Sequence, residues 1–167
     1  HVAELAPDGA SVVAADVDGQ TASLRDARSG KRLATLTGHS DQVLAVGYSP
    51  KGDVVATGAA DGTARLWSAE TGELLHTLRA HDGDVLATQF DAAGGRLATL
   101  GTDRAVRVWD VRSGRELQAL VGAHGRTNAQ EAWAEGFEFV GDDRIAVSPW
   151  ARGNSLSPVV ARIFELS

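Results

Sequence analysis

The sequence predicts an all-β fold in which about four antiparallel units repeat along the chain. Three sets of marker residues recur at intervals of 42 or 43 positions. They are Gly30, Gly72 and Gly114; His39, His81 and His124; and Asp18, Asp61 and Asp103. Self-similarity at a fixed period of about 20 to 50 residues is the signature of a repeat architecture. The period therefore defines the structural unit before any strand is assigned.

Each unit is expected to contain four short strands and no helix. In the second unit these strands cover residues 43–48, 54–58, 63–68 and 74–78. The runs are rich in Val, Leu, Thr or aromatic residues and are separated by Gly, Pro or Asp. Gly30, Gly72 and Gly114 suit hairpin loops that need a residue with positive φ. Four-stranded antiparallel units with a period of about 40 to 45 residues are the blades of a β-propeller.

The whole chain, residues 1–167, is expected to form one partial propeller. Its repeats are placed at about 1–37, 38–79, 80–121 and 122–167. The sequence opens within a first strand at 2–6 and ends after a third strand at 160–166, which gives four blades less one outer strand. We therefore expect an open arc whose remaining blades lie elsewhere in a longer parent chain. Closure of the ring by a second copy is the alternative.

Composition and charge exclude several classes of protein. With 43% hydrophobic and 23% charged residues, the chain is typical of a globular protein with a packed core. A net charge of -6 and a pI near 5.3 argue against a nucleic-acid partner. No apolar run reaches about 18 residues and no leader is visible, so we expect no membrane segment and a cytoplasmic location. The absence of Cys excludes cysteine nucleophiles and thiolate metal sites.

The two middle units carry the most specific motifs. In the second unit the markers are Gly38-His39, Asp61-Gly62 and Trp67. In the third unit they are His81, Asp103 and Trp109-Asp110. In these residues the chain resembles the WD-repeat β-propeller family, and the resemblance extends over nearly the whole chain.

The resemblance implies a structural tetrad in each middle blade, consisting of a His, a hydroxyl residue, an Asp and a Trp. Carried over by position, the tetrads are His39, Thr57, Asp61 and Trp67, and then His81, Thr99, Asp103 and Trp109. These side chains can form a chain of hydrogen bonds from indole to hydroxyl to imidazole to carboxylate. In the first unit Ala14 and Arg25 replace Thr and Trp, and in the last unit Val147 and Phe164 do so. Neither outer unit is therefore assigned a tetrad.

A Thr, a His and an Asp within one repeat also match the types of a nucleophile, a base and its orienting group. The structural interpretation is favoured because the set recurs in consecutive blades and its hydroxyl is expected to be buried. A metal site is disfavoured because His39, His81 and His124 lie at the starts of three different blades, whereas the ligands of a metal must converge on one ion. The sequence thus predicts no catalytic residues, no metal and no cofactor.

The last unit contains two insertions that could form a partner site. The loop that leads into the last blade carries six extra residues, within segment 125–133. The connection between the second and third strands of that blade carries seven more, within segment 149–158. Insertions of this kind often collect on the binding face of a repeat protein, and Trp and Arg are favoured interface anchors. The candidate residues for binding a protein or peptide are Arg126, Trp133, Trp150, Arg152 and Asn154. Alternatively, the longer loops pack over the edge of their own blade.

The function predicted from these features is a non-catalytic scaffold for protein–protein interaction within a larger signalling or regulatory protein. The Ala-, Gly-, Arg- and Asp-rich composition resembles propellers attached to bacterial signalling kinases, NTPases or transcriptional regulators. A propeller that senses a signal and restrains an attached enzyme is one alternative. Another is a small-ligand or enzymatic site near the last-blade loops, for which Glu131, Glu135 and Arg152 are the candidate groups.

Overall fold

The computed structural model describes residues 2–121, 134–141, 143–149 and 162–166, and within these ranges it contains fifteen strands in four antiparallel sheets and no helix. The first sheet comprises β1 (Ala3–Leu5), β2 (Ser11–Ala15), β3 (Ala22–Asp26) and β4 (Arg32–Leu36). The second comprises β5 (Val43–Tyr48), β6 (Val54–Ala59), β7 (Thr63–Ser68) and β8 (Leu74–Arg79). The third comprises β9 (Val85–Phe90), β10 (Arg96–Gly101), β11 (Ala105–Asp110) and β12 (Glu116–Val121). The last comprises β13 (Ala134–Val140), β14 (Arg144–Pro149) and β15 (Arg162–Glu165).

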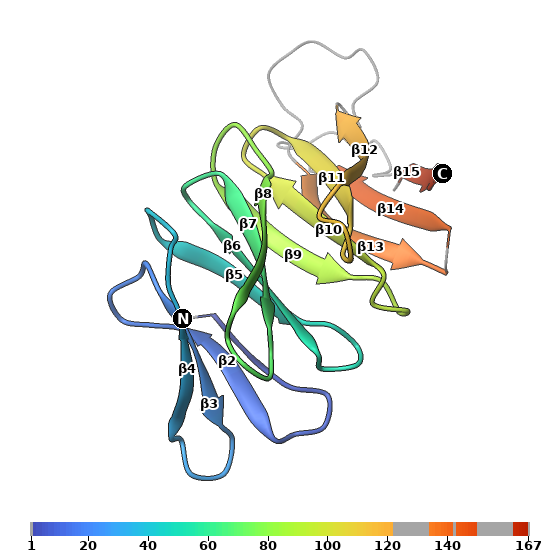
Figure 1. Cartoon of the computed structure of the whole chain (residues 1–167). Coiled ribbons are helices and arrows are strands. Elements are labelled where there is room, and N and C mark those ends of the chain that lie inside the picture. Colours follow the sequence, from blue (N-terminus) through green and yellow to red (C-terminus); the bar gives the residue numbers. More distant parts are fainter. Residues whose placement is uncertain (1, 122–133, 142, 150–161, 167) are drawn as a thin grey trace, which may run out of the picture.

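The fold class predicted from the sequence is confirmed. The sheets follow one another in chain order along an open arc, with the first and last sheets at opposite ends (Figure 1). The last sheet has three strands rather than the four of a complete blade among the described residues. Strands β6 and β8 each extend one residue further than the pattern of apolar residues indicated.

Equivalent hairpins connect the third and fourth strands of the first three sheets. Gly30, Gly72 and Gly114 have φ angles of 70°, 73° and 68°, which confirms the expected need for positive φ. Each glycine N–H donates to the carbonyl four residues earlier, at 2.8 to 2.9 Å. Gly72 also lies against Ala34 of the preceding sheet, so a side chain there would collide with its neighbour. These turns fix the register of the strands that carry the site residues.

The hydrophobic core lies in layers between successive sheets, because alternate residues of each strand point to opposite faces. The layer between the first and second sheets includes Val13, Leu24, Leu36, Val55 and Trp67. The layer between the second and third includes Leu66, Leu78, Val85, Leu97 and Trp109. The layer between the third and last includes Leu100, Val108, Leu120, Ile145 and Val147. Each middle sheet is therefore buried on both faces, and its Trp points toward the sheet before it.

The strands of a sheet differ in exposure according to their position in the arc. Strands β1, β5 and β9 contact one another in succession, and β13 contacts β10, so the first strands lie where the sheets converge. Strands β4, β8 and β12 form the opposite edges, and each exposes a leucine at an equivalent position: Leu33, Leu75 and Leu117. In the described part of the chain, no helix is long and apolar enough to cross a membrane.

Candidate functional site

In the second sheet the structure joins four side chains into one hydrogen-bonded chain. His39 lies before β5, Thr57 lies on β6, Asp61 lies in the turn after β6, and Trp67 lies on β7. The Trp67 indole Nε1 donates to Thr57 Oγ1 at 2.9 Å. Thr57 Oγ1 lies 2.7 Å from His39 Nε2, and His39 Nδ1 lies 3.0 Å from Asp61 Oδ2. Because the hydroxyl accepts from the indole, it donates to Nε2, which leaves the imidazole proton on Nδ1, where it donates to the carboxylate.

The third sheet repeats this arrangement one period later. Trp109 Nε1 donates to Thr99 Oγ1 at 3.1 Å, and Thr99 Oγ1 lies 2.9 Å from His81 Nε2. His81 Nδ1 lies 2.7 Å from Asp103 Oδ1. The threonine hydroxyls of both sets are inaccessible to solvent, and both histidines are buried. All eight side chains that the family resemblance marks as tetrads are thus brought together in two sets.

Burial and hydrogen bonding set the charge states within the two tetrads. Burial lowers the pKa of His39 and His81, and the neighbouring carboxylates offset this effect only in part. Burial raises the pKa of Asp61, but hydrogen bonds from the Thr63 side chain and from the backbone N–H groups of Ser40 and Thr63 outweigh it and lower the pKa to about 2. At neutral pH, each tetrad therefore pairs a neutral imidazole with a carboxylate.

We expect the free energy of unfolding to decrease as the pH falls below about 6.5. The histidine pKa values are lowered in the folded state, so between the folded and unfolded pKa values the unfolded chain binds more protons. The stability contributed by the neutral histidines is present in full above the histidine pKa of the unfolded chain. It is lost as the pH falls through the lower histidine pKa of the folded protein. Asp61 adds a second loss as the pH falls from 3.8 toward about 2.

Urea unfolding at intervals between pH 8 and pH 5 measures the histidine effect. His76 provides a matched control, because it takes no part in a tetrad and its Nε2 lies 3.0 Å from the Arg112 carbonyl oxygen. The variant His76→Gln should retain the same pH dependence. A free energy of unfolding that stays constant or increases as the pH is lowered from 7 to 5 would contradict this account of the tetrads.

The first sheet replaces the tetrad with an ionic cluster. The Asp16 carboxylate accepts from the Ser23 hydroxyl at 2.9 Å and from Arg32 Nη2 at 3.0 Å. Arg25 lies at the position of the tetrad Trp and donates through Nε to Ser23 Oγ at 3.1 Å. Sequence reasoning noted Ala14 and Arg25 as departures but missed the cluster. Asp16, which lies at the position of Ala59 in the second sheet, was the signal that could have revealed it.

The last sheet fills the equivalent position with apolar side chains. Val147 on β14 is fully buried and pairs in register with Arg162, while Ile145 pairs with Phe164. These residues contribute to the core layer against the third sheet. The five candidate partner-binding residues, Arg126, Trp133, Trp150, Arg152 and Asn154, lie outside the described residues, as does Glu131. Glu135 lies on β13.

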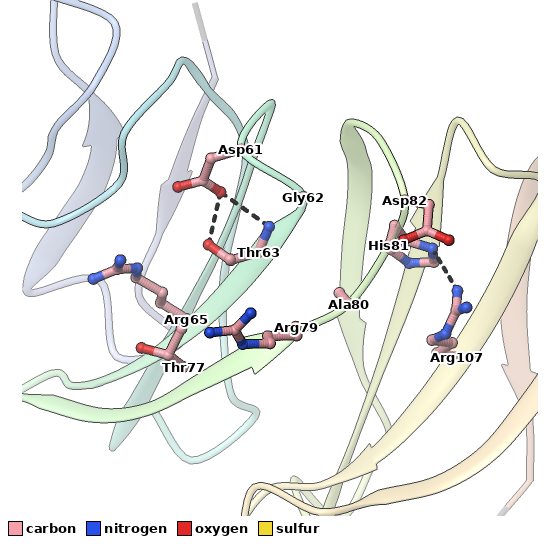
Figure 2. Close-up of a pocket in the computed structure, with 10 residues that line it drawn as sticks. All are labelled: Asp61, Gly62, Thr63, Arg65, Thr77, Arg79, Ala80, His81, Asp82 and Arg107. Carbon is pink, nitrogen blue, oxygen red and sulfur yellow. Dashed lines mark hydrogen bonds between the residues drawn. The ribbon is translucent and has the colours of Figure 1, made fainter.

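A polar cleft of about 450 Å³ lies at the end of β8, beside the tetrad loops of the second and third sheets. Figure 2 shows its lining residues, among which are three arginines, Arg65, Arg79 and Arg107. Arg107 Nη1 donates to Asp103 Oδ2 at 2.8 Å, and its Nε lies 3.7 Å from a Glu116 oxygen. The sequence did not predict this cleft, because its lining depends on how strands from two sheets are placed relative to each other.

The hydroxyl groups of both tetrads are committed to hydrogen bonds within their blades. Among the described residues, no group of three or more His, Asp or Glu side chains could hold a metal ion. The Thr57 and Thr99 hydroxyls each accept from an indole and donate to an imidazole. The accessible polar groups instead line the cleft at the end of β8.

Comparisons with known proteins identify the repeat. The family model described as WD domain, G-beta repeat matches residues 30–68 and 72–110. Each match begins before the last strand of one sheet and ends with the third strand of the next, so it spans two sheets. No curated protein sequence matches the chain.

A crystal structure of the WD40 repeats of RRP9 matches 88% of this chain with a TM-score of 0.75 and 20% sequence identity. The match covers 44% of the RRP9 chain, so this chain spans less than half of it. At this identity the likeness establishes the fold. Residues 30–68 and 72–110 therefore match the WD40 repeat in sequence, and the chain that carries them has the fold of a WD40 β-propeller.

Proposed function

We propose that the chain is an arc of a WD40 propeller that serves as a non-catalytic scaffold for protein–protein interaction. WD40 repeats generally mediate such interactions, and the two matched repeats form the centre of the arc. The observation that carries the proposal is the pair of tetrads. In each tetrad the Thr, His and Asp side chains hydrogen-bond to one another and hold the loops of the blade in place. Two adjacent sheets thereby present fixed loops and polar side chains to a partner.

The geometry of the threonines supports a structural role for the tetrads. Thr57 and Thr99 have no solvent-accessible surface, so a substrate could reach their hydroxyls only after the blade opened. The network satisfies all of these groups in the folded state, which favours stability rather than turnover.

The finer parts of the proposal concern the parent protein. We place the arc in a bacterial signalling or regulatory protein of the cytoplasm, which is supported by the likeness of its composition to such propellers. The match to less than half of the RRP9 chain supports further blades, because a ring needs neighbours for the outer faces of the first and last sheets. Sequencing the gene on both sides of these residues would test this part directly.

The inserted segments of the last repeat remain our proposed partner site. Their tryptophans and arginines are of the types that anchor protein interfaces. Affinity capture with the full parent chain, followed by mass spectrometry, should recover a protein partner. The double variant Trp133→Ala, Trp150→Ala should lose most of this binding while melting at the parent temperature. Undiminished binding by that variant would exclude this site, and failure of the parent chain to recover any partner would contradict the scaffold function.

A further inference from the structure

We propose that the β3–β4 hairpin of the first sheet binds an acidic segment of a partner protein through Arg25 and Arg32. This inference rests on the proposed scaffold function and names one of its contact surfaces. The chain as a whole has a net charge of -6, which repels an acidic ligand. Attraction must therefore come from a local excess of basic side chains, and this hairpin has such an excess.

Charge is distributed unequally among the equivalent hairpins of the first three sheets. Residues 25–32 of the first sheet contain one acidic side chain, Asp26, and four basic ones, Arg25, Arg28, Lys31 and Arg32, which leaves a net charge of +3. The equivalent residues 67–74 contain two acidic side chains and no basic one. Residues 109–116 contain two of each. The basic hairpin is thus a feature of the first sheet and does not follow from the repeat itself.

Arg25 lies on the face of the first sheet that is turned away from the second. It pairs with Val12 as Trp67 pairs with Val55, and Trp67 points toward the sheet before its own. The first sheet lies at one end of the arc, so this face has no neighbouring sheet within the described ranges (Figure 1). The Arg25 side chain keeps 38% of its surface exposed, whereas Trp67 is buried. Arginine in place of tryptophan therefore adds an accessible cation to the end face of the arc.

Strand pairing and one carboxylate bring two of the arginines together. Arg25 and Arg32 are partners in the register of β3 and β4. Their Nη2 atoms lie 3.4 and 3.0 Å from the same oxygen, Asp16 Oδ1. Like charges opposite each other on paired strands repel, and the one carboxylate balances only one of the two. The cluster therefore retains one unbalanced positive charge.

The Asp16 carboxylate is surrounded by donors of its own sheet. Its side chain is 12% exposed, and Oδ1 also accepts from the Ser23 hydroxyl at 2.9 Å. Oδ2 accepts from Thr21 Oγ1 at 3.1 Å. Asp16 is thus a positioning residue that holds the two guanidinium groups side by side. It leaves their solvent-exposed sides to an external carboxylate.

The ligand that fits this surface is a segment with consecutive acidic residues. A carboxylate can accept charge-assisted hydrogen bonds from more than one guanidinium group. Arg28 and Lys31 are exposed in the adjoining turn and would attract the next acidic side chain of the segment. The Asp26 carboxylate accepts from the backbone N–H of Ser29 at 2.7 Å, which directs it into the turn.

Fluorescence anisotropy with the full parent chain tests the surface with the labelled peptide fluorescein-Gly-Glu-Glu-Glu-Glu-Gly-amide. This peptide should bind saturably, and its Gln analogue should not. The variant Arg32→Gln should weaken binding about tenfold while melting at the parent temperature, because a surface ion pair contributes little to stability. Arg115→Gln is the matched control, since Arg115 occupies the position of Lys31 in the third sheet, and it should leave binding unchanged.

Salt and a second polyanion complete the test. Raising the salt from about 50 to about 200 mM should weaken binding of the Glu peptide severalfold, because exposed charges are screened. No binding of this peptide, or equal weakening by Arg32→Gln and Arg115→Gln, would overturn the assignment to the hairpin. Tighter binding of a thymidine oligonucleotide of equal charge would overturn the assignment to a protein segment. If the parent chain still captures its partner in any of these cases, the scaffold function stands and only this surface is wrong.

Discussion

Replacing Thr57 by Val is expected to lower the free energy of unfolding by about 2 to 6 kcal/mol. The substitution keeps the shape of the side chain but removes the hydroxyl that serves both the Trp67 indole and the His39 imidazole. Two buried polar groups then lose a partner, and each unsatisfied group costs about 1 to 3 kcal/mol. Val has a high preference for strands, so the backbone is not the source of the loss.

Thr77→Val provides the matched control for this measurement. Thr77 lies on β8 of the same sheet, is exposed, and takes no part in the tetrad. Its replacement should change stability by no more than about 0.5 kcal/mol. Urea unfolding of both variants at pH 7.5 would show the difference. Equal stability of the two variants would mean that the tetrad hydrogen bonds do not hold the blade together.

Replacing Asp103 by Ala should cost a similar amount, about 2 to 4 kcal/mol, for an electrostatic reason. The carboxylate accepts from His81 and from Arg107, whose Nη1 lies only 2.9 Å from His81 Nδ1. Without the carboxylate, the Arg107 guanidinium faces the Nδ1–H of His81. Both groups are hydrogen-bond donors, so they repel each other. The charge of Asp103 is therefore what allows Arg107 and His81 to lie side by side.

A double-mutant cycle separates this effect from simple loss of contacts. Arg107→Gln alone should cost about 0.5 to 1.5 kcal/mol, because Asp103 keeps its hydrogen bond from His81. In the double variant the repulsion is absent, so the combined loss should be smaller than the sum of the two single losses. Additive losses, measured by thermal or urea unfolding, would show that the three groups are not coupled.

The sequence predicted the layout of the middle sheets because local rules determine it. A strict period, alternation of side chains along each strand and turn glycines place the strands, and the family resemblance implies the tetrad of His39, Thr57, Asp61 and Trp67 within one blade. The structure then brings these side chains within hydrogen-bonding distance. Agreement between repeats made this pattern readable from one sequence.

The ionic cluster of the first sheet could not be read in the same way. Its members come from two strands and the turn after β2, and Asp16 approaches Arg25 and Arg32 only after the sheet has formed. The cleft is a stronger example, because its lining comes from two sheets, and strand patterns do not contain the placement of one sheet relative to the other.

The most direct test of the structural role of the tetrads is native-state hydrogen exchange at the indole N–H groups of Trp67 and Trp109. Both groups donate to threonine hydroxyls that have no accessible surface. The account predicts that they exchange only through opening of their blades, with free energies close to that of global unfolding. Exchange at the rate of an exposed indole would contradict it, since the threonines would then be accessible in the folded protein.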